Sequence, residues 1–152
     1  MKLTAHFSLA EFTRSESAKR HGVSNEPTPE HLKNLIVLCE KVLEPIRMKF
    51  GPINISSGYR SKALNHYIGG SLNSQHCEAK AADIDMDGMT NATNKEIFDF
   101  IKDTLDFDQL IFEFGTKDAP DWVHVSYNGA KNRKQVLRAL KVNGKTAYAP
   151  YK

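Results

Sequence analysis

Hydrophobic positions recur at helical spacing in two stretches of the chain. The first stretch follows Thr28-Pro29, a helix N-cap with proline at the first helical position, and it runs to Gly51-Pro52. The second follows the capping box Thr93-Asn-Lys-Glu96. The apolar positions of the two stretches are Leu32, Leu35, Ile36, Cys39, Leu43 and Ile46, and then Ile97, Phe100, Ile101 and Leu105. The pattern predicts a long core helix over 29–50 and a shorter amphipathic helix after residue 93.

Two further short helical segments are marked by their caps. Ser8-Leu-Ala-Glu11 is a capping box, and the helix that follows it is expected to end near His21-Gly22. Ser61 caps a short helix through about Ile68, where Gly69-Gly70 breaks it.

Strand patterns are concentrated in the second half of the chain. Alternating or short apolar runs occupy residues 53–56, 81–85, 109–114 and 122–127. Asn143-Gly144 is a hairpin signal between strands at 136–142 and 146–148. Because helices come first and strands cluster late, the sequence predicts an α+β fold rather than a doubly wound sheet. We expect N-terminal helices packed on a small, mostly antiparallel sheet.

Composition limits what this fold can be. With 152 residues, 40% hydrophobic and 26% charged, the chain fits one soluble domain over 1–152 that buries its own core. The longest apolar run, Leu35 to Cys39, is too short to cross a bilayer, and the first residues lack the apolar stretch of a signal peptide. We therefore expect a product that is cytoplasmic at synthesis. Two cysteines are too few for a disulfide framework.

Charge is distributed unevenly along the chain. Residues 78–121 contain twelve acidic residues and four lysines, whereas residues 129–152 contain seven basic residues and no acidic one. Carboxylates in the middle suit a metal ion, and a basic tail suits an anionic polymer such as cell-wall material. The tail lacks the interleaved aromatic residues of single-strand binders, so no nucleic-acid partner is expected.

Two imidazoles and one carboxylate could form a metal site. His76 and Asp83 flank the entry to the strand at 81–85, and His124 lies within the strand at 122–127. A catalytic zinc site needs three such ligands and an open fourth position, and these ligand types suit zinc better than magnesium or calcium. A histidine within a strand is also commonly a packed core residue, so residue types alone leave both interpretations open.

Three ordered motifs add a resemblance to a known family. They are Ser57-Gly-Tyr-Arg60, then Ser74-Gln-His76-Cys-Glu-Ala-Lys-Ala-Ala-Asp83, then Trp122-Val-His124-Val-Ser126. In this order they resemble the zinc peptidases of the D-alanyl-D-alanine carboxypeptidase group, which includes phage endolysins and peptidoglycan carboxypeptidases and shares its fold with the hedgehog signalling domain. The opening residues, 6–15, look like the phage and prophage branch. One departure is Ala79, which stands where the family motif has glycine.

The resemblance implies zinc ligands at His76, Asp83 and His124, with Arg60 polarising the scissile carbonyl and holding the oxyanion. A carboxylate must also accept the proton of the attacking water, and Asp121 and Glu113 are the two candidates. Asp121 lies three residues before His124, an odd offset on a strand, so it would have to curl back after Pro120. Glu113 shares a strand face with Gln109 and Ile111. We favour Asp121, and expect only one of the two to be indispensable.

Polar and aromatic neighbours complete the expected site. Ser74 and Gln75 are expected to bind substrate or orient the ligands. Tyr59 and Trp122 are candidates for cleft walls that stack on a peptide or sugar, although aromatic residues beside a strand ligand are more commonly core.

The expected function is a zinc-dependent peptidase that hydrolyses a bond in the stem or cross-link of bacterial peptidoglycan, as an endolysin or a carboxypeptidase. The expected partners are peptidoglycan peptides, with no nucleic acid and no membrane, and the expected state is a monomer. If phage-derived and released, it would act on the cell wall. The alternative is a non-catalytic, zinc-containing wall-binding module. A complete proton-transfer set, Arg60 with Asp121 or Glu113, favours the enzyme.

Overall fold

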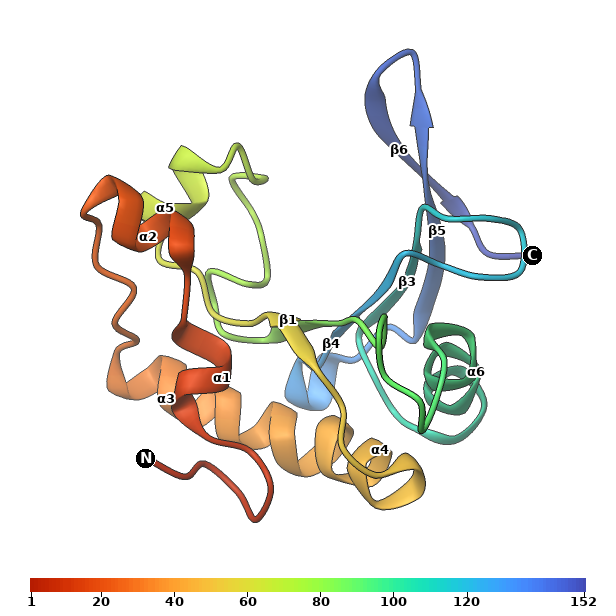
Figure 1. Cartoon of the computed structure of the whole chain (residues 1–152), viewed down its shortest axis with the longest axis horizontal. Helices are drawn as coiled ribbons and strands as arrows, with labels where there is room; N and C mark the ends of the chain where they lie inside the picture. Colours follow the sequence, from red (N-terminus) through yellow and green to blue (C-terminus); the bar gives the residue numbers. More distant parts are fainter.

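Six strands form one sheet in the computed structural model, which describes all 152 residues (Figure 1). The order across the sheet is β1-β2-β4-β3-β5-β6. Every neighbouring pair is antiparallel except β3 and β5, which run parallel. The strands are β1 (Ile55–Ser57), β2 (Ala81–Ile84), β3 (Gln109–Glu113), β4 (Trp122–Ser126), β5 (Gln135–Val142) and β6 (Lys145–Pro150). The predicted α+β class with a mostly antiparallel sheet is confirmed.

Each predicted helix is present and begins at its expected cap. The helices are α1 (Leu9–Thr13), α2 (Glu16–His21), α3 (Pro29–Leu38), α4 (Glu44–Phe50), α5 (Lys62–Tyr67) and α6 (Asn94–Thr104). The hydroxyls of Thr28, Ser61 and Thr93 accept hydrogen bonds from the backbone three residues on, as N-caps do. The predicted first helix is divided into α1 and α2, because Arg14 takes an extended conformation and Ser15 caps a new helix.

The long helix over 29–50 contains a π-helical segment, Cys39–Leu43, between α3 and α4. Pro45 lies at the start of α4 and has no backbone N–H to donate to the preceding turn. A π-bulge places one extra residue in a turn, and this widened turn accommodates the proline without ending the helix. The helix was predicted from its apolar spacing, but the bulge was not.

Alternation along the central strands divides the sheet into a core face and an open face. Leu110 and Phe112 of β3, and Val123 and Val125 of β4, belong to the buried core that includes residues of α3, α4 and α6. Their neighbours point to the other face because successive side chains on a strand alternate. The open face therefore carries polar residues at the centre of the sheet.

The C-terminal hairpin of β5 and β6 extends away from the helical part of the molecule (Figure 1). Asn143 and Gly144 form its turn, both with positive φ angles, as the Asn-Gly signal predicted. All of β6 is exposed. No helix is both long and apolar enough to cross a membrane.

Candidate metal centre and its cleft

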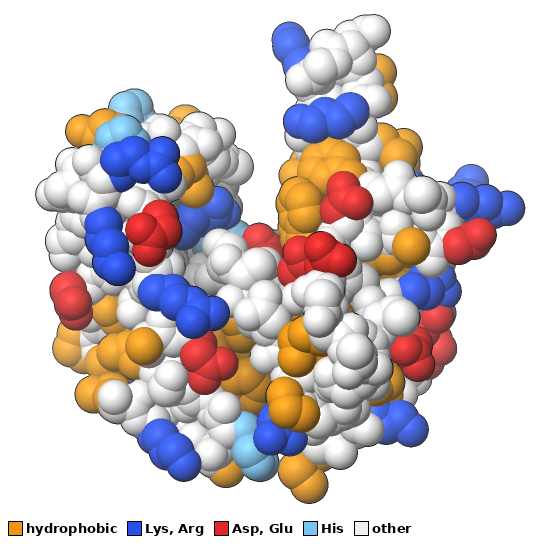
Figure 2. All heavy atoms as spheres, in the orientation of Figure 1, with side chains coloured by type: hydrophobic (Ala, Val, Ile, Leu, Met, Phe, Trp, Pro, Cys, Tyr) orange, Lys and Arg blue, Asp and Glu red, His pale blue; other side chains and the backbone are white.

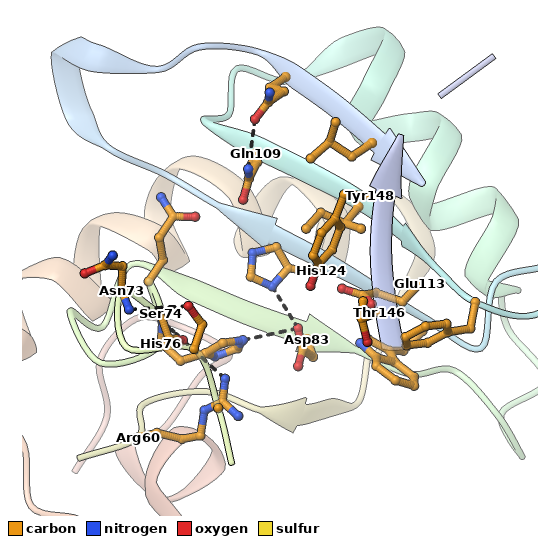
Figure 3. Close-up of a pocket in the computed structure, with 18 of the residues that line it drawn as sticks. Arg60, Asn73, Ser74, His76, Asp83, Gln109, Glu113, His124, Thr146 and Tyr148 are labelled. Carbon is orange, nitrogen blue, oxygen red and sulfur yellow. Dashed lines mark hydrogen bonds and ion pairs between the residues drawn. The ribbon is translucent and has the colours of Figure 1, made fainter. Parts of the chain in front are cut away.

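Three side chains on the open face converge into a cluster: His76, Asp83 and His124. Oδ1 of Asp83 lies 3.3 Å from Nε2 of His76 and 3.1 Å from Nδ1 of His124. One nitrogen or oxygen from each residue lies within 4.8 Å of the other two. Figure 3 shows both rings directed at the carboxylate of Asp83. The sequence-predicted ligands are thus brought together.

Strand register accounts for two of the three positions. Asp83 of β2 is the direct partner of His124 in β4, so their side chains emerge side by side on the same face. His76 comes from the turn that leads into β2. In that turn Ala79 has a φ of 60°, and its N–H donates to the His76 carbonyl at 3.2 Å. Alanine therefore adopts the left-handed torsion for which the family motif has glycine.

The outward nitrogen of His76 is held by the backbone. Nδ1 of His76 lies 2.7 Å from the carbonyl oxygen of Gly58. Since a carbonyl only accepts, Nδ1 carries the hydrogen, which leaves Nε2 as the ring nitrogen that faces Asp83. Such a partner behind a histidine ligand is typical of metal centres.

The donor set fits a tetrahedral zinc ion. Bonds of about 2.0–2.1 Å in a tetrahedron require ligand atoms about 3.3–3.4 Å apart, close to the two spacings around Asp83. Burial alone would raise the pKa of Asp83, but the charges and hydrogen bonds of His76 and His124 hold it well below its usual range. Asp83 is therefore a carboxylate at neutral pH, the form that binds a cation.

The cluster lies at the base of a cleft of about 980 Å³. Figure 2 shows the molecule hollowed between the helical part and the C-terminal hairpin, with acidic side chains at the base of the hollow. Other residues with polar side chains that line the cleft are Arg60, Ser71, Asn73, Ser74, Gln75, Gln109, Glu113, Trp122, Arg133, Gln135, Thr146 and Tyr148.

The two candidate proton acceptors occupy different places. Glu113, at the end of β3, lines the cleft and is 7% exposed. Burial raises its pKa to about 7, with His124 opposing the shift and Asp83 adding to it. Asp121 is exposed and lines a separate hollow. The expected curl of Asp121 back toward the cluster does not occur, because β4 presents Trp122 and His124 to the cleft and residues at odd offset point away.

Arg60 lines the cleft beside the cluster and makes hydrogen bonds to His76 and Ser74. Its backbone N–H donates to the His76 carbonyl at 3.1 Å, and its Nη2 donates to the hydroxyl of Ser74 at 3.3 Å. That hydroxyl also accepts from the backbone N–H of His76 at 3.2 Å. The Nε of Arg60 is buried without a partner. Unsatisfied buried donors are rare, and functional sites are among the places where they persist.

The two aromatic candidates for the cleft wall, Trp122 and Tyr59, lie in different places. Trp122 is half-buried, lines the cleft and packs edge-on against Phe114 at 5.4 Å between ring centroids. Tyr59 is 5% exposed and belongs to the hydrophobic core, where its ring meets His31. The expectation that Tyr59 walls the cleft was wrong about its position, because its ring packs into the core while the adjacent Arg60 lines the cleft.

Several cleft residues were missed by sequence reasoning. Tyr148 and Thr146 of β6 and Arg133 before β5 come from the basic tail, which was interpreted as a surface for wall attraction. Register brings Tyr148 there: Glu113 pairs with Ala139, and Ala139 pairs with Tyr148. The available signal was the hairpin at Asn143-Gly144, but nothing in the sequence paired β5 with β3.

Comparison with known proteins agrees with this geometry. Among curated proteins, none matches the chain significantly. The sequence model of the peptidase M15 family matches residues 5–126, which include all three cluster residues, Arg60 and Glu113. This match covers most of the chain and bears out the resemblance to the zinc D-Ala-D-Ala carboxypeptidase group. The protein belongs to the peptidase M15 family.

Proposed function

We propose that the protein is a zinc-dependent peptidase that hydrolyses a peptide bond in the stem or cross-link of bacterial peptidoglycan. One observation carries the proposal: three metal-type donors, a half-buried arginine and a buried carboxyl group of raised pKa share a single cleft. A wall-binding module without catalysis has no need of a proton acceptor there. Membership of the peptidase M15 family supports the same conclusion.

His76, Asp83 and His124 would hold the ion through Nε2, the carboxylate and Nδ1 respectively. Zinc supplies Lewis-acid activation of water and of a carbonyl group near neutral pH. The Gly58 carbonyl keeps His76 in the required tautomer, and Asp83 remains ionised between the two rings.

Glu113 is the proposed general base. Its carboxyl group points into the cleft on the side of Tyr148 and Thr146 (Figure 3). A carboxylate with a pKa near the working pH accepts a proton from the attacking water and can then return it to the leaving amine. This role takes the place of the one expected for Asp121, which lies outside the cleft.

Arg60 is the proposed donor to the carbonyl oxygen of the scissile bond. The hydrogen bond from Nη2 to Ser74 holds the guanidinium before substrate arrives, and the backbone N–H of Arg60 is held by the His76 carbonyl. Preorganised donors stabilise the negative charge that develops on that oxygen as water attacks. The proposed roles of binding, proton transfer and charge stabilisation thus fall on different residues.

The test is to incubate purified protein with purified peptidoglycan, with and without a chelator, and to measure new amino groups and the masses of released fragments. We expect release that a chelator abolishes and added zinc restores, with His76→Ala inactive. Fragment masses identify the bond that is cut. Zinc binding without release from any wall type would overturn the peptidase and favour the non-catalytic wall-binding module.

A further inference from the structure

A fully buried carboxylate lies just beyond the cleft. Asp108 directly precedes β3, and its side chain is 0% exposed. Oδ1 accepts from the backbone N–H of Arg133 at 2.9 Å and from its Nε at 2.9 Å. Oδ2 accepts from Nη2 of Arg133 at 3.0 Å and from Nε2 of Gln75 at 2.8 Å. Hydrogen bonds from Arg133 hold the pKa of Asp108 at about 2, so the carboxylate is ionised whenever the protein is folded near neutral pH.

The carboxylate of Asp108 holds one edge of the Arg133 guanidinium, the edge formed by Nε and Nη2. Its side chain is 56% exposed and lines the same cleft as the metal-type cluster. Nε and Nη2 are used by Asp108, whereas Nη1 has no hydrogen-bond partner in the protein. Here the anion is buried and the cation is presented to the cleft in a fixed orientation.

Asp108 also connects Arg133 to the metal centre. Gln75 donates to the same oxygen as Arg133, and Gln75 directly precedes the ligand His76. Nε2 of Gln75 and Nη2 of Arg133 therefore both lie next to Oδ2 of Asp108. Any peptide that reaches the cluster along this wall passes Arg133.

Strand register places Arg133 on a definite side of the cluster. His124 is the partner of Ile111 in β3. Two residues earlier in β3, on the same face, is Gln109, which pairs with Gln135 of β5. Arg133 bonds to Asp108, which directly precedes Gln109, so Arg133 lies at the Gln109 end of β3. Glu113 lies in the opposite direction from Ile111. Arg133 and the proposed base thus flank the metal centre on opposite sides.

We propose that Arg133, oriented by Asp108, forms a subsite that binds a carboxylate of the substrate peptide. The inference rests on the proposed function and adds to it a feature that the substrate must carry. A guanidinium held on one edge binds a carboxylate with little loss of side-chain freedom on association, and the charged hydrogen bonds are among the strong ones. Arg133 is a specificity-determining residue, because it contacts the substrate away from the scissile bond.

Two kinds of carboxylate could occupy this subsite, the C-terminal carboxylate of a stem peptide or the α-carboxylate of a γ-linked D-glutamate. Two pairs of probes distinguish them. The first is diacetyl-L-Lys-D-Ala-D-Ala as the acid and as the C-terminal amide. The second is L-Ala-γ-D-Glu-L-Lys with the glutamate α-carboxylate free or amidated. Binding is measured by calorimetry in zinc-loaded Glu113→Gln protein, so that no turnover interferes.

With Arg133 intact, we expect the acid of one pair to bind at least about tenfold more tightly than its amide. Arg133→Met should reduce this ratio to within about twofold, while the matched control Lys131→Met, an exposed cation two residues away, should leave it unchanged. Arg133→Met leaves Asp108 buried without its partner and can fail to fold. The double variant Arg133→Met with Asp108→Asn removes that charge, and thermal unfolding verifies its fold.

Equal affinities within both pairs, no binding of any probe, or an acid preference that persists in the folded arginine variant would each overturn the subsite. Hydrolysis of peptidoglycan by the native protein is measured in a separate experiment. An acid preference without hydrolysis overturns the proposed peptidase and keeps the subsite. Hydrolysis without an acid preference overturns the subsite and keeps the peptidase.

Discussion

His76 and Gly58 are joined by a hydrogen bond of 2.7 Å between the ring Nδ1 and the backbone carbonyl oxygen. Gly58 can hold this position because it has no side chain: a Cβ there would lie 2.7 Å from the Cα of Phe12 in α1. The N-terminal helix α1 therefore packs directly against the backbone group that orients His76, a proposed metal ligand. We expect the stability of the helical part and the affinity for metal to be coupled at this contact.

Substituting Gly58→Ala should disturb both properties. The added methyl group forces α1 and the 58–60 backbone apart, at a cost of about 1–3 kcal/mol in the free energy of unfolding. Displacement of the carbonyl from His76 should weaken zinc binding by about 10–100-fold. Urea unfolding and calorimetric zinc titration measure the two effects. Gly22→Ala is the control: its Cβ meets nothing within 4 Å, so it should cost only the left-handed strain at its φ of 65° and leave zinc affinity unchanged.

The two carboxylate candidates should differ sharply in activity. Glu113→Gln should lower kcat by about 10²–10⁴-fold while zinc still binds, because the proton acceptor is lost and the ligands remain. Asp121→Asn should stay within about twofold of the native rate, because Asp121 is exposed outside the cleft and makes no contact that general acid–base catalysis requires. Release of amino groups from peptidoglycan measures the rates. An inactive Asp121→Asn protein that still binds zinc would contradict this assignment.

Glu113 should also give the metal-free protein a distinctive pH dependence of stability. Its pKa is 4.5 when unfolded and about 7 when folded, mainly because of burial. The folded state binds the proton more tightly, so the stabilising contribution is complete below pH 4.5 and is lost as pH rises through 7. At about 1.4 kcal/mol per pKa unit, the loss amounts to about 3–4 kcal/mol.

The measurement is urea unfolding of chelated native protein and of the Glu113→Gln variant at about pH 5 and about pH 8, on either side of the folded pKa. The native protein should lose stability relative to the variant as pH rises, since the amide that replaces the carboxyl group does not ionise. Asp83 is common to both proteins and cancels in the difference. A constant difference between the two proteins at both pH values would show that burial does not disfavour the charged form of Glu113.

Ala79→Gly should be nearly neutral, although φ at this residue is 60°. Glycine removes about 1–2 kcal/mol of left-handed strain. It also loses a fully buried methyl group and gains freedom in the unfolded chain, which together cost a similar amount. We expect a change in unfolding free energy below about 1 kcal/mol. Ala79→Val, which keeps the strain and adds volume to a buried site, should cost more than about 2 kcal/mol and serves as the contrasting variant.

Local sequence signals predicted much of the fold. Hydroxyl caps and apolar spacing placed the helices, since those signals act within one or two turns of the chain. Alternation along residues 109–113 placed Glu113 on the same face as Ile111, and Ile111 proved to be the partner of the ligand His124. The odd-offset argument against Asp121 agrees with its exposed position outside the cleft, and which of the two carboxylates accepts the proton stays a prediction.

Long-range pairings were beyond these signals. Asp108 and Arg133 are 25 residues apart, and each alone has the character of a solvated surface charge. Only the parallel pairing of β5 with β3 brings the segment before β5 beside the segment before β3. Tyr148 reaches the cleft through two successive strand pairings, so its position depends on the entire sheet. The π-helical turn at Cys39–Leu43 likewise depends on how the helix accommodates Pro45.

The C-terminal hairpin has a consequence for self-association. In the sheet, β5 occupies the outer edge of β3, and the residues of β5 and β6 lie beyond the part of the chain that the family model matches. In a fragment ending at residue 126, the backbone groups along one edge of β3 would have no partner strand. This edge would include the apolar residues Leu110 and Phe112. Such an edge is a template for pairing with another copy of itself. The hairpin therefore covers this edge of the central sheet, and we expect a chain shortened to residues 1–126 to aggregate.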